Sequence, residues 1–185
     1  KLNGVWHAHR FDPRSDVGPP ASNKLHINSV DCTDAGLSFA GLRTRGIISL
    51  APGATLAEQV ELPEGVHNAR LTNDGVLFND TAANYLRYVR RDGNERRFAF
   101  PVYEERELEF TGIDDSKLAR QGFGRGLCMI NQQLIAAGSS PSTVTVFDLE
   151  SGMTVFSVNF SMDIRNAIHG LKVWPFELPT ARRQR

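Results

Sequence analysis

Apolar and polar residues alternate along most of this chain in short runs, and the runs repeat. The first run covers residues 25–39, LHINSVDCTDAGLSF, where an apolar stretch, a polar turn and a second apolar stretch follow one another. Alternation with a period of two over runs of this length predicts half-buried β-strands. The pattern returns after positions 67 and 125 and, in part, after position 169. We therefore expect a repeat protein built from strands.

Each copy of the pattern begins at one polar residue, which we call the anchor. The anchors are His26, His67, Arg125 and His169, and they stand 41, 58 and 44 residues apart. This spacing is typical of four-stranded blades in a β-propeller, where every blade starts at the central axis. A single blade can bury its two apolar faces only against its neighbours. The sequence thus predicts an all-β fold, a β-propeller with four-stranded antiparallel blades.

Three complete blades are expected within one domain that covers residues 1–180. The predicted blades span about 25–62 (strands near 26–32, 37–42, 46–50 and 56–62), 65–103 (strands near 67–72, 76–79, 84–90 and 96–102) and 124–160 (strands near 126–130, 134–138, 142–148 and 153–160). The Asp92-Gly93 pair between two apolar runs is a strong hairpin signal. A partial blade would combine an inner strand within 167–176 with a strand within 1–15.

Residues 104–123 interrupt the strand rhythm and lengthen the second spacing between anchors. They are polar, carry both signs of charge, and include a short helix predicted over 114–120 with Asp114 as its cap. Long loops on such scaffolds shape the sites beside them, so this insertion is a candidate lid. Residues 181–185 form a basic tail that we expect to be solvated.

An open stack of three blades and a fraction exposes strand edges, which invites aggregation. The ring of blades could be closed in three ways. The chain could form a four-bladed ring completed by the N-terminal strand, it could be a fragment of a six- to seven-bladed chain, or two copies could associate. The start at Lys1, without a methionine and in the middle of the pattern, favours the fragment. The ring would then be completed either by a missing chain segment or by a homo-oligomer.

Charge and composition narrow the classes of partner. Lys plus Arg and Asp plus Glu number 21 each, so the formal net charge is zero and nucleic acids and anionic membranes are not expected partners. No apolar run approaches the ~20 residues that cross a bilayer. We expect a soluble protein, with a cytoplasmic location slightly favoured, and a small molecule as its ligand.

Equivalent residues of inner strands point at one central channel, so the four anchors should converge. Imidazole can act as a nucleophile or a base, and a guanidinium can hold an anion with two parallel hydrogen bonds. We therefore predict His26, His67, Arg125 and His169 as catalytic residues. Asn28, Asn68 and Arg70 lie on the same stretches and are the predicted substrate-binding residues. The corresponding activity is group transfer or hydrolysis on a small anionic or ester-bearing substrate.

Two alternatives remain beside the catalytic interpretation. Three imidazoles, His26, His67 and His169, could hold a divalent metal ion such as zinc or non-haem iron, although no local ligand motif supports it. His7 and His9 are a weaker pair. In the other alternative the histidines are structural and join neighbouring blades, because any buried polar group needs a partner. The propeller would then bind a ligand without turnover or bind another protein.

Two stretches resemble known families. Residues 26–31, HINSVD, and 66–75, VHNARLTNDG, resemble the blade starts of arylsulfotransferase-type propellers. That resemblance implies chemistry in which a sulfo group passes through a histidine. Residues 147–152, FDLESG, and 166–175, NAIHGLKVWP, are similar to an uncharacterised family of bacterial propeller proteins.

Overall fold

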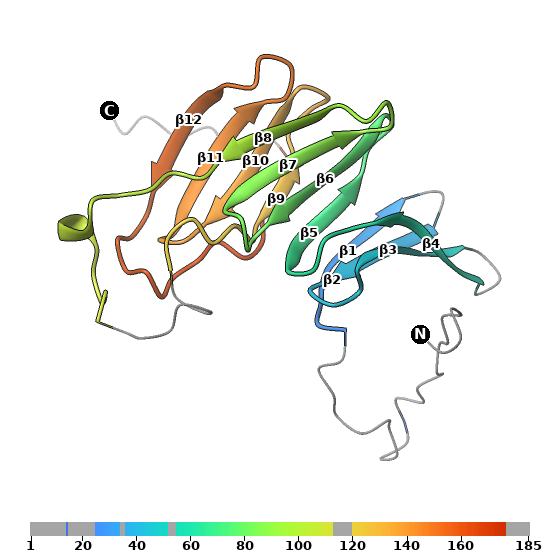
Figure 1. Cartoon of the computed structure of the whole chain (residues 1–185), viewed down its shortest axis with the longest axis horizontal. Helices are drawn as coiled ribbons and strands as arrows, with labels where there is room; N and C mark the ends of the chain where they lie inside the picture. The colour runs from blue at the N-terminus through green and yellow to red at the C-terminus, as the bar shows by residue number, and fades with distance from the viewer. Residues whose placement is uncertain (1–13, 15–24, 34–35, 52–54, 113–119, 177–185) are drawn as a thin grey trace, which may run out of the picture.

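A computed structural model describes residues 14, 25–33, 36–51, 55–112 and 120–176 of the chain. It contains three four-stranded antiparallel sheets, each with its strands hydrogen-bonded in chain order (Figure 1). The strands are β1 (Ile27–Thr33), β2 (Gly36–Gly41), β3 (Gly46–Ala51) and β4 (Thr55–Glu61); β5 (Val66–Leu71), β6 (Gly75–Asp80), β7 (Tyr85–Arg90) and β8 (Glu95–Ala99); and β9 (Leu127–Met129), β10 (Leu134–Ser139), β11 (Thr143–Asp148) and β12 (Thr154–Asn159). The predicted all-β fold is confirmed, and every strand predicted between residues 26 and 160 is present.

The three sheets are the blades of a β-propeller. Sheets β5–β8 and β9–β12 lie face to face in Figure 1, and sheet β1–β4 contacts the second sheet through strands β1, β2, β3 and β5. The only helix among the described residues is a short 3-10 turn, η1 (Glu105–Glu107), in the insertion. No helix in the described part of the chain is long and apolar enough to cross a membrane.

Apolar side chains join the blades in two clusters. Between the second and third blades, Phe98 and Phe100 lie against Phe147, with ring centroids 5.2 and 6.3 Å apart. The rest of this cluster is the buried set Leu77, Leu86, Tyr88, Ile135, Ala137 and Leu149. A second cluster joins the first two blades through Ala40, Ile47, Leu62, Val66, Ala69, Val76 and Phe78. Each blade therefore buries apolar area only because a neighbour covers it.

The glycine-rich run at 122–126 is a place of close packing between blades. A Cβ on Gly124 would lie 2.3 Å from the Phe100 ring, so no other residue fits there without displacing that ring. The carbonyl groups of Gly124 and Gly126 accept hydrogen bonds from the second blade, at 2.7 Å from Thr81 Oγ1 and 3.0 Å from Asn79 Nδ2. Glycine at these positions therefore lets the backbones of the second and third blades approach closely.

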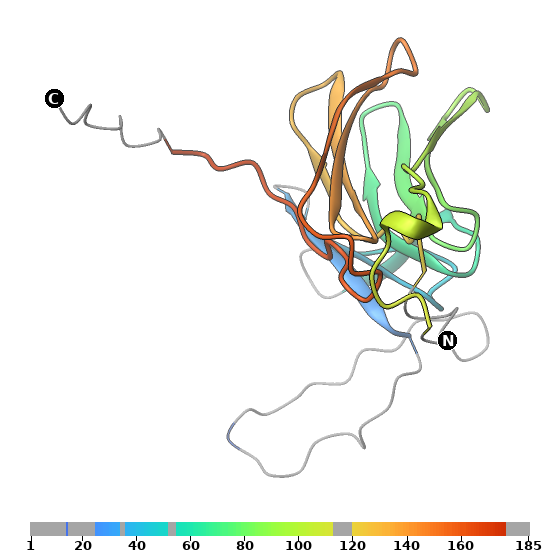
Figure 2. The ribbon, with the colours of Figure 1, turned by 90° about the vertical axis from the view of Figure 1, so that its left-hand side faces the viewer.

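The segment after His169 differs from the prediction. An inner strand was expected within 167–176, but these residues form no strand, because no described strand lies alongside to complete a ladder. Figure 2 shows the last described part of the chain running away from the sheets. The predicted N-terminal strand, His7 and His9, the helix over 114–120 and the basic tail lie outside the described residues, apart from Arg120 itself.

Candidate functional site

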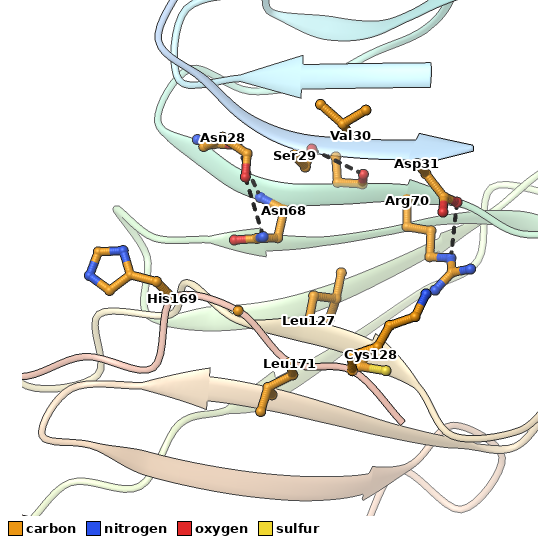
Figure 3. Close-up of a pocket in the computed structure, with 13 residues that line it drawn as sticks. Asn28, Ser29, Val30, Asp31, Asn68, Arg70, Leu127, Cys128, His169 and Leu171 are labelled. Carbon is orange, nitrogen blue, oxygen red and sulfur yellow. Dashed lines mark hydrogen bonds and ion pairs between the residues drawn. The ribbon is translucent and has the colours of Figure 1, made fainter. Parts of the chain in front are cut away.

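A cavity of about 320 Å³ opens where the starts of the blades meet (Figure 3). Residues from β1, β5 and β9 form three of its sides, and the segment around His169 forms the fourth. The lining is Asn28, Ser29, Val30, Asp31, Asn68, Ala69, Arg70, Leu127, Cys128, His169, Gly170, Leu171 and Lys172. Segments that are far apart in the sequence therefore share one hollow.

The lining follows the repeat. The residues two positions after the four anchors all line the cavity: Asn28, Ala69, Leu127 and Leu171. So do the residues three positions after the anchors: Ser29, Arg70, Cys128 and Lys172. The four copies thus occupy equivalent places around one centre, which is the arrangement expected at the axis of a propeller.

The anchors themselves lie close together but mostly beside the cavity. The ring centroids of His26 and His67 are 6.1 Å apart, and those of His67 and Phe123 are also 6.1 Å apart. The Arg125 guanidinium lies 4.3 Å from the centre of the Phe123 ring, and its Nη1 is 3.0 Å from His169 Nε2. Of the four, only His169 lines the cavity. This cavity is therefore not the expected pocket lined by all four anchors.

His67 is a buried residue held within the second blade. Its side chain is 7% exposed, and its Nδ1 is 2.9 Å from Thr81 Oγ1. The Thr81 hydroxyl donates its proton to the Gly124 carbonyl, so His67 Nδ1 must be the donor to Thr81. Burial, followed by the charges of Arg125 and His26, lowers the pKa of His67 from 6.5 to about 4. His67 is therefore neutral at pH 7 and fixed in one tautomer.

Arg125 is a half-buried cation without a carboxylate partner among the described residues. Its side chain contacts the Phe123 ring and His169, and its buried Nε has no hydrogen-bond partner in the described part of the chain. Burial lowers the pKa of Arg125, yet a guanidinium stays charged at neutral pH. Burial and the Arg125 charge likewise lower the pKa of His169. The neutral imidazole thus accepts a hydrogen bond from the cation.

The predicted substrate-binding residues line the cavity but also join the first two blades. Asn28 Nδ2 donates to the Val66 carbonyl at 3.1 Å, and its Oδ1 accepts from the Asn68 backbone N–H at 3.2 Å. Arg70 Nε is 3.2 Å from Asp31 Oδ2. Figure 3 shows the Asn28–Asn68 and Arg70–Asp31 contacts along one wall of the cavity. Their polar groups are therefore largely engaged in holding β1 to β5.

Lys172 and Thr81 were not singled out from the sequence. Lys172 lines the cavity, and no described carboxylate lies within ion-pair distance of it. Its repeat position, three residues after an anchor as in Arg70, was a signal that could have identified it. No sequence signal marks Thr81, because its role depends on the contact with His67 across the blade.

No metal centre is found among the residues that the structure describes: no three His, Cys, Asp or Glu side chains come together as ligands. His67 Nδ1 is occupied by Thr81, and His169 Nε2 faces a cation, which is an unfavourable neighbour for a metal ion. Cys128, which lines the cavity, is a buried free thiol, whereas Cys32 is exposed. The metal-ligand hypothesis for His26, His67 and His169 gains no support.

Comparisons with known proteins concern the fold. No protein-family model and no curated protein sequence matches this chain. Among solved structures, a catalytically inactive virginiamycin B lyase from Staphylococcus aureus with quinupristin is 15% identical over 69% of this chain, with a TM-score of 0.40. The Neurospora crassa Pan2 WD40 domain is 13% identical over 84%, with a TM-score of 0.45, and a streptogramin B lyase is 15% identical over 70%, with a TM-score of 0.38.

This chain spans only 42 to 43% of the length of each of these structures. At such low identity and TM-score, the activities in their names do not transfer to this protein. The predicted resemblance to arylsulfotransferase-type propellers is not shown by these comparisons. The architecture, three four-stranded antiparallel blades of a β-propeller, is established by the sheets themselves.

Proposed function

We propose that this protein binds a small anionic molecule in the cavity at the starts of its blades. Arg125 carries the proposal, because it is a half-buried cation with no carboxylate beside it in the described part of the chain. Taking a charge out of water costs free energy unless a partner of opposite sign is present. An anion that reaches past His169 to Arg125 would supply that partner.

The charges of the lining support the same proposal. Asp31 is the only acidic residue of the lining, and it is already paired with Arg70. Lys172 lines the cavity, and Arg125 adjoins it through His169. The site therefore has an excess of positive charge, which raises the local concentration of anions. A volume of about 320 Å³ suits a small molecule rather than a polymer.

Group transfer or hydrolysis is the second candidate, and His169 is the residue that favours it. It is the one histidine anchor that lines the cavity, and its imidazole is neutral because burial and Arg125 lower its pKa. In a reaction it would serve as nucleophile or base, with Arg125 holding developing negative charge. His67 is too buried for contact with substrate, so we assign it a structural role instead.

The test uses inorganic phosphate and sulfate as probes, measured by isothermal titration calorimetry on the wild type and on Arg125→Gln. A charge-assisted hydrogen bond contributes about 1.5 to 3 kcal/mol, so the variant should bind about ten- to a hundredfold more weakly. The matched control is Arg97→Gln, because Arg97 is an exposed arginine paired with Glu95 in the second blade. The control should bind both probes as the wild type does.

Unchanged binding by Arg125→Gln would contradict the proposal. If Arg97→Gln lost the same affinity for the probes, the loss would come from the change in net charge and not from the position of Arg125. Turnover of a chromogenic aryl ester or aryl sulfate that disappears in His169→Gln would support the enzymatic candidate, whereas binding without turnover would leave recognition as the function.

A further inference from the structure

The outer edge strands of the blades differ in how well their side chains prevent pairing with a strand of another chain. β8 contains three charged residues, Glu95, Arg96 and Arg97, among its five positions. β12 contains none, and neither do the residues on either side of it from Met153 to Met162, MTVFSVNFSM. Charged side chains on an edge strand are a common means of preventing other chains from pairing with it. β12 lacks this protection.

β12 is also open. It is the terminal strand of its sheet, and among the described residues no strand lies on its free side. Figure 1 shows it at the outer edge of the third blade. Its first five residues are all exposed. The strand therefore presents unpaired backbone N–H and C=O groups to its surroundings.

Three apolar side chains of β12 are exposed. Val155 and Phe156 are neighbours in sequence, and each is 52% exposed; Val158 is 43% exposed. A strand added at this edge would gain cross-strand apolar contacts as well as backbone hydrogen bonds. Exposed β-branched and aromatic residues on an edge without charge mark an interaction surface rather than a solvated end.

We propose that β12 pairs edge to edge, in antiparallel orientation, with β12 of a second copy of this chain. Antiparallel pairing of a strand with itself has two-fold symmetry, so one surface serves both partners. Such pairing brings together two strands without charge, and the chain has no net charge to oppose association. Self-pairing of β8 would instead bring arginines close to arginines. Of these two edge strands, β12 is thus the one that can pair with its own copy without bringing like charges together.

The dimer brings the outer edges of two blades together, far from the anchors, so it is independent of the proposed anion site. Its size is limited to a strand of six residues per copy and the side chains beside it. Interfaces of that size are at the weak end of stable association. The dimer is therefore expected to depend on protein concentration.

The test is sedimentation equilibrium of the whole chain at low and high protein concentration. The wild type should move from monomer to dimer, and Val158→Lys and Val155→Lys should each raise the dimer Kd about tenfold or more, because each places a charged side chain in an otherwise uncharged pair of strands. The control is Val102→Lys, a valine that is 73% exposed and outside the strands. It should dimerise as the wild type does, and circular dichroism verifies that each variant is folded.

Hydrogen exchange measured at the same two concentrations locates the contact. Amides of β12 should exchange more slowly in the concentrated sample, while those of β8 should not change. A wild type that is monomeric throughout, an equal effect of Val102→Lys, or protection that builds at β8 would each overturn the proposal.

Discussion

Replacing Phe147 by alanine is expected to destabilise the fold by about 3 to 5 kcal/mol, the usual cost of removing a buried phenylalanine side chain. Phe147 is 1% exposed and lies against Phe98 and Phe100, so the change leaves a hole at the centre of the contact between the second and third blades. Urea unfolding of wild type and variant, followed by circular dichroism at one protein concentration, measures the difference.

The matched control is Phe176→Ala, because Phe176 is 66% exposed and lies beyond the sheets. The same number of atoms is removed, but little buried area is lost, so the expected change is below about 1 kcal/mol. If the two variants lose equal stability, the apolar contact between these blades does not hold them together.

Acid should destabilise the protein through His67. In the folded chain the pKa of His67 is lowered from 6.5 to about 4, so between these pH values the unfolded chain binds a proton that the folded chain does not. This contribution to stability is complete above pH 6.5 and decreases as the pH falls toward 4. A shift of this size corresponds to about 3 kcal/mol. Urea unfolding at a series of pH values measures it.

The informative variant is His67→Asn, whose amide can still donate to Thr81 but does not titrate. Its stability should depend much less on pH between 6.5 and 4, because only His169, whose pKa is also lowered, still contributes there, whereas His169→Asn should retain most of the dependence of the wild type. Glu95 has a pKa lowered to about 2 by Arg87 and Arg97, so its contribution is lost as the pH falls below 4.5 and is common to all three proteins. A pH dependence as large in His67→Asn as in the wild type would show that another group is responsible.

The strands could be predicted from the sequence because their signals are local. Alternation within runs such as Thr143–Asp148, and turn pairs such as Asp92-Gly93, specify a strand or hairpin whatever lies across from it. The prediction of an inner strand near His169 was wrong because that strand depends on a contact that is not local. A strand needs a partner in a ladder, and the apolar pattern of a segment does not say whether one is present.

The candidate site was predicted only in part, and the error is one of position along the repeat. The four copies do meet at one centre, but the residues two and three places after the anchors form the lining. Irregular pairing in β1, between Ile27 and Ser29, and in β5, between His67 and Arg70, changes which side chains face the axis. His26 and Asn68, which adjoin or lie in these irregularities, have positive φ angles. Such local irregularity is not visible in a pattern of period two.

The roles of individual side chains were harder still to predict. Asn28 and Asn68 were expected to contact substrate, yet their hydrogen bonds run to each other and to the neighbouring strand. Whether an amide contacts a ligand or the next blade depends on distances across the fold. The same limit applies to His67, where burial and the Thr81 contact favour a structural role.

Phe123 links the insertion to the candidate site. The guanidinium of Arg120, near the end of the insertion, lies 4.9 Å from the centre of this ring, and that of Arg125 lies 4.3 Å from it. A substitution of Arg120 therefore removes one of the two guanidinium groups that contact the ring on which Arg125 rests. Ligand preference can thus diverge among relatives through changes in a surface loop, while the blades keep their sequence.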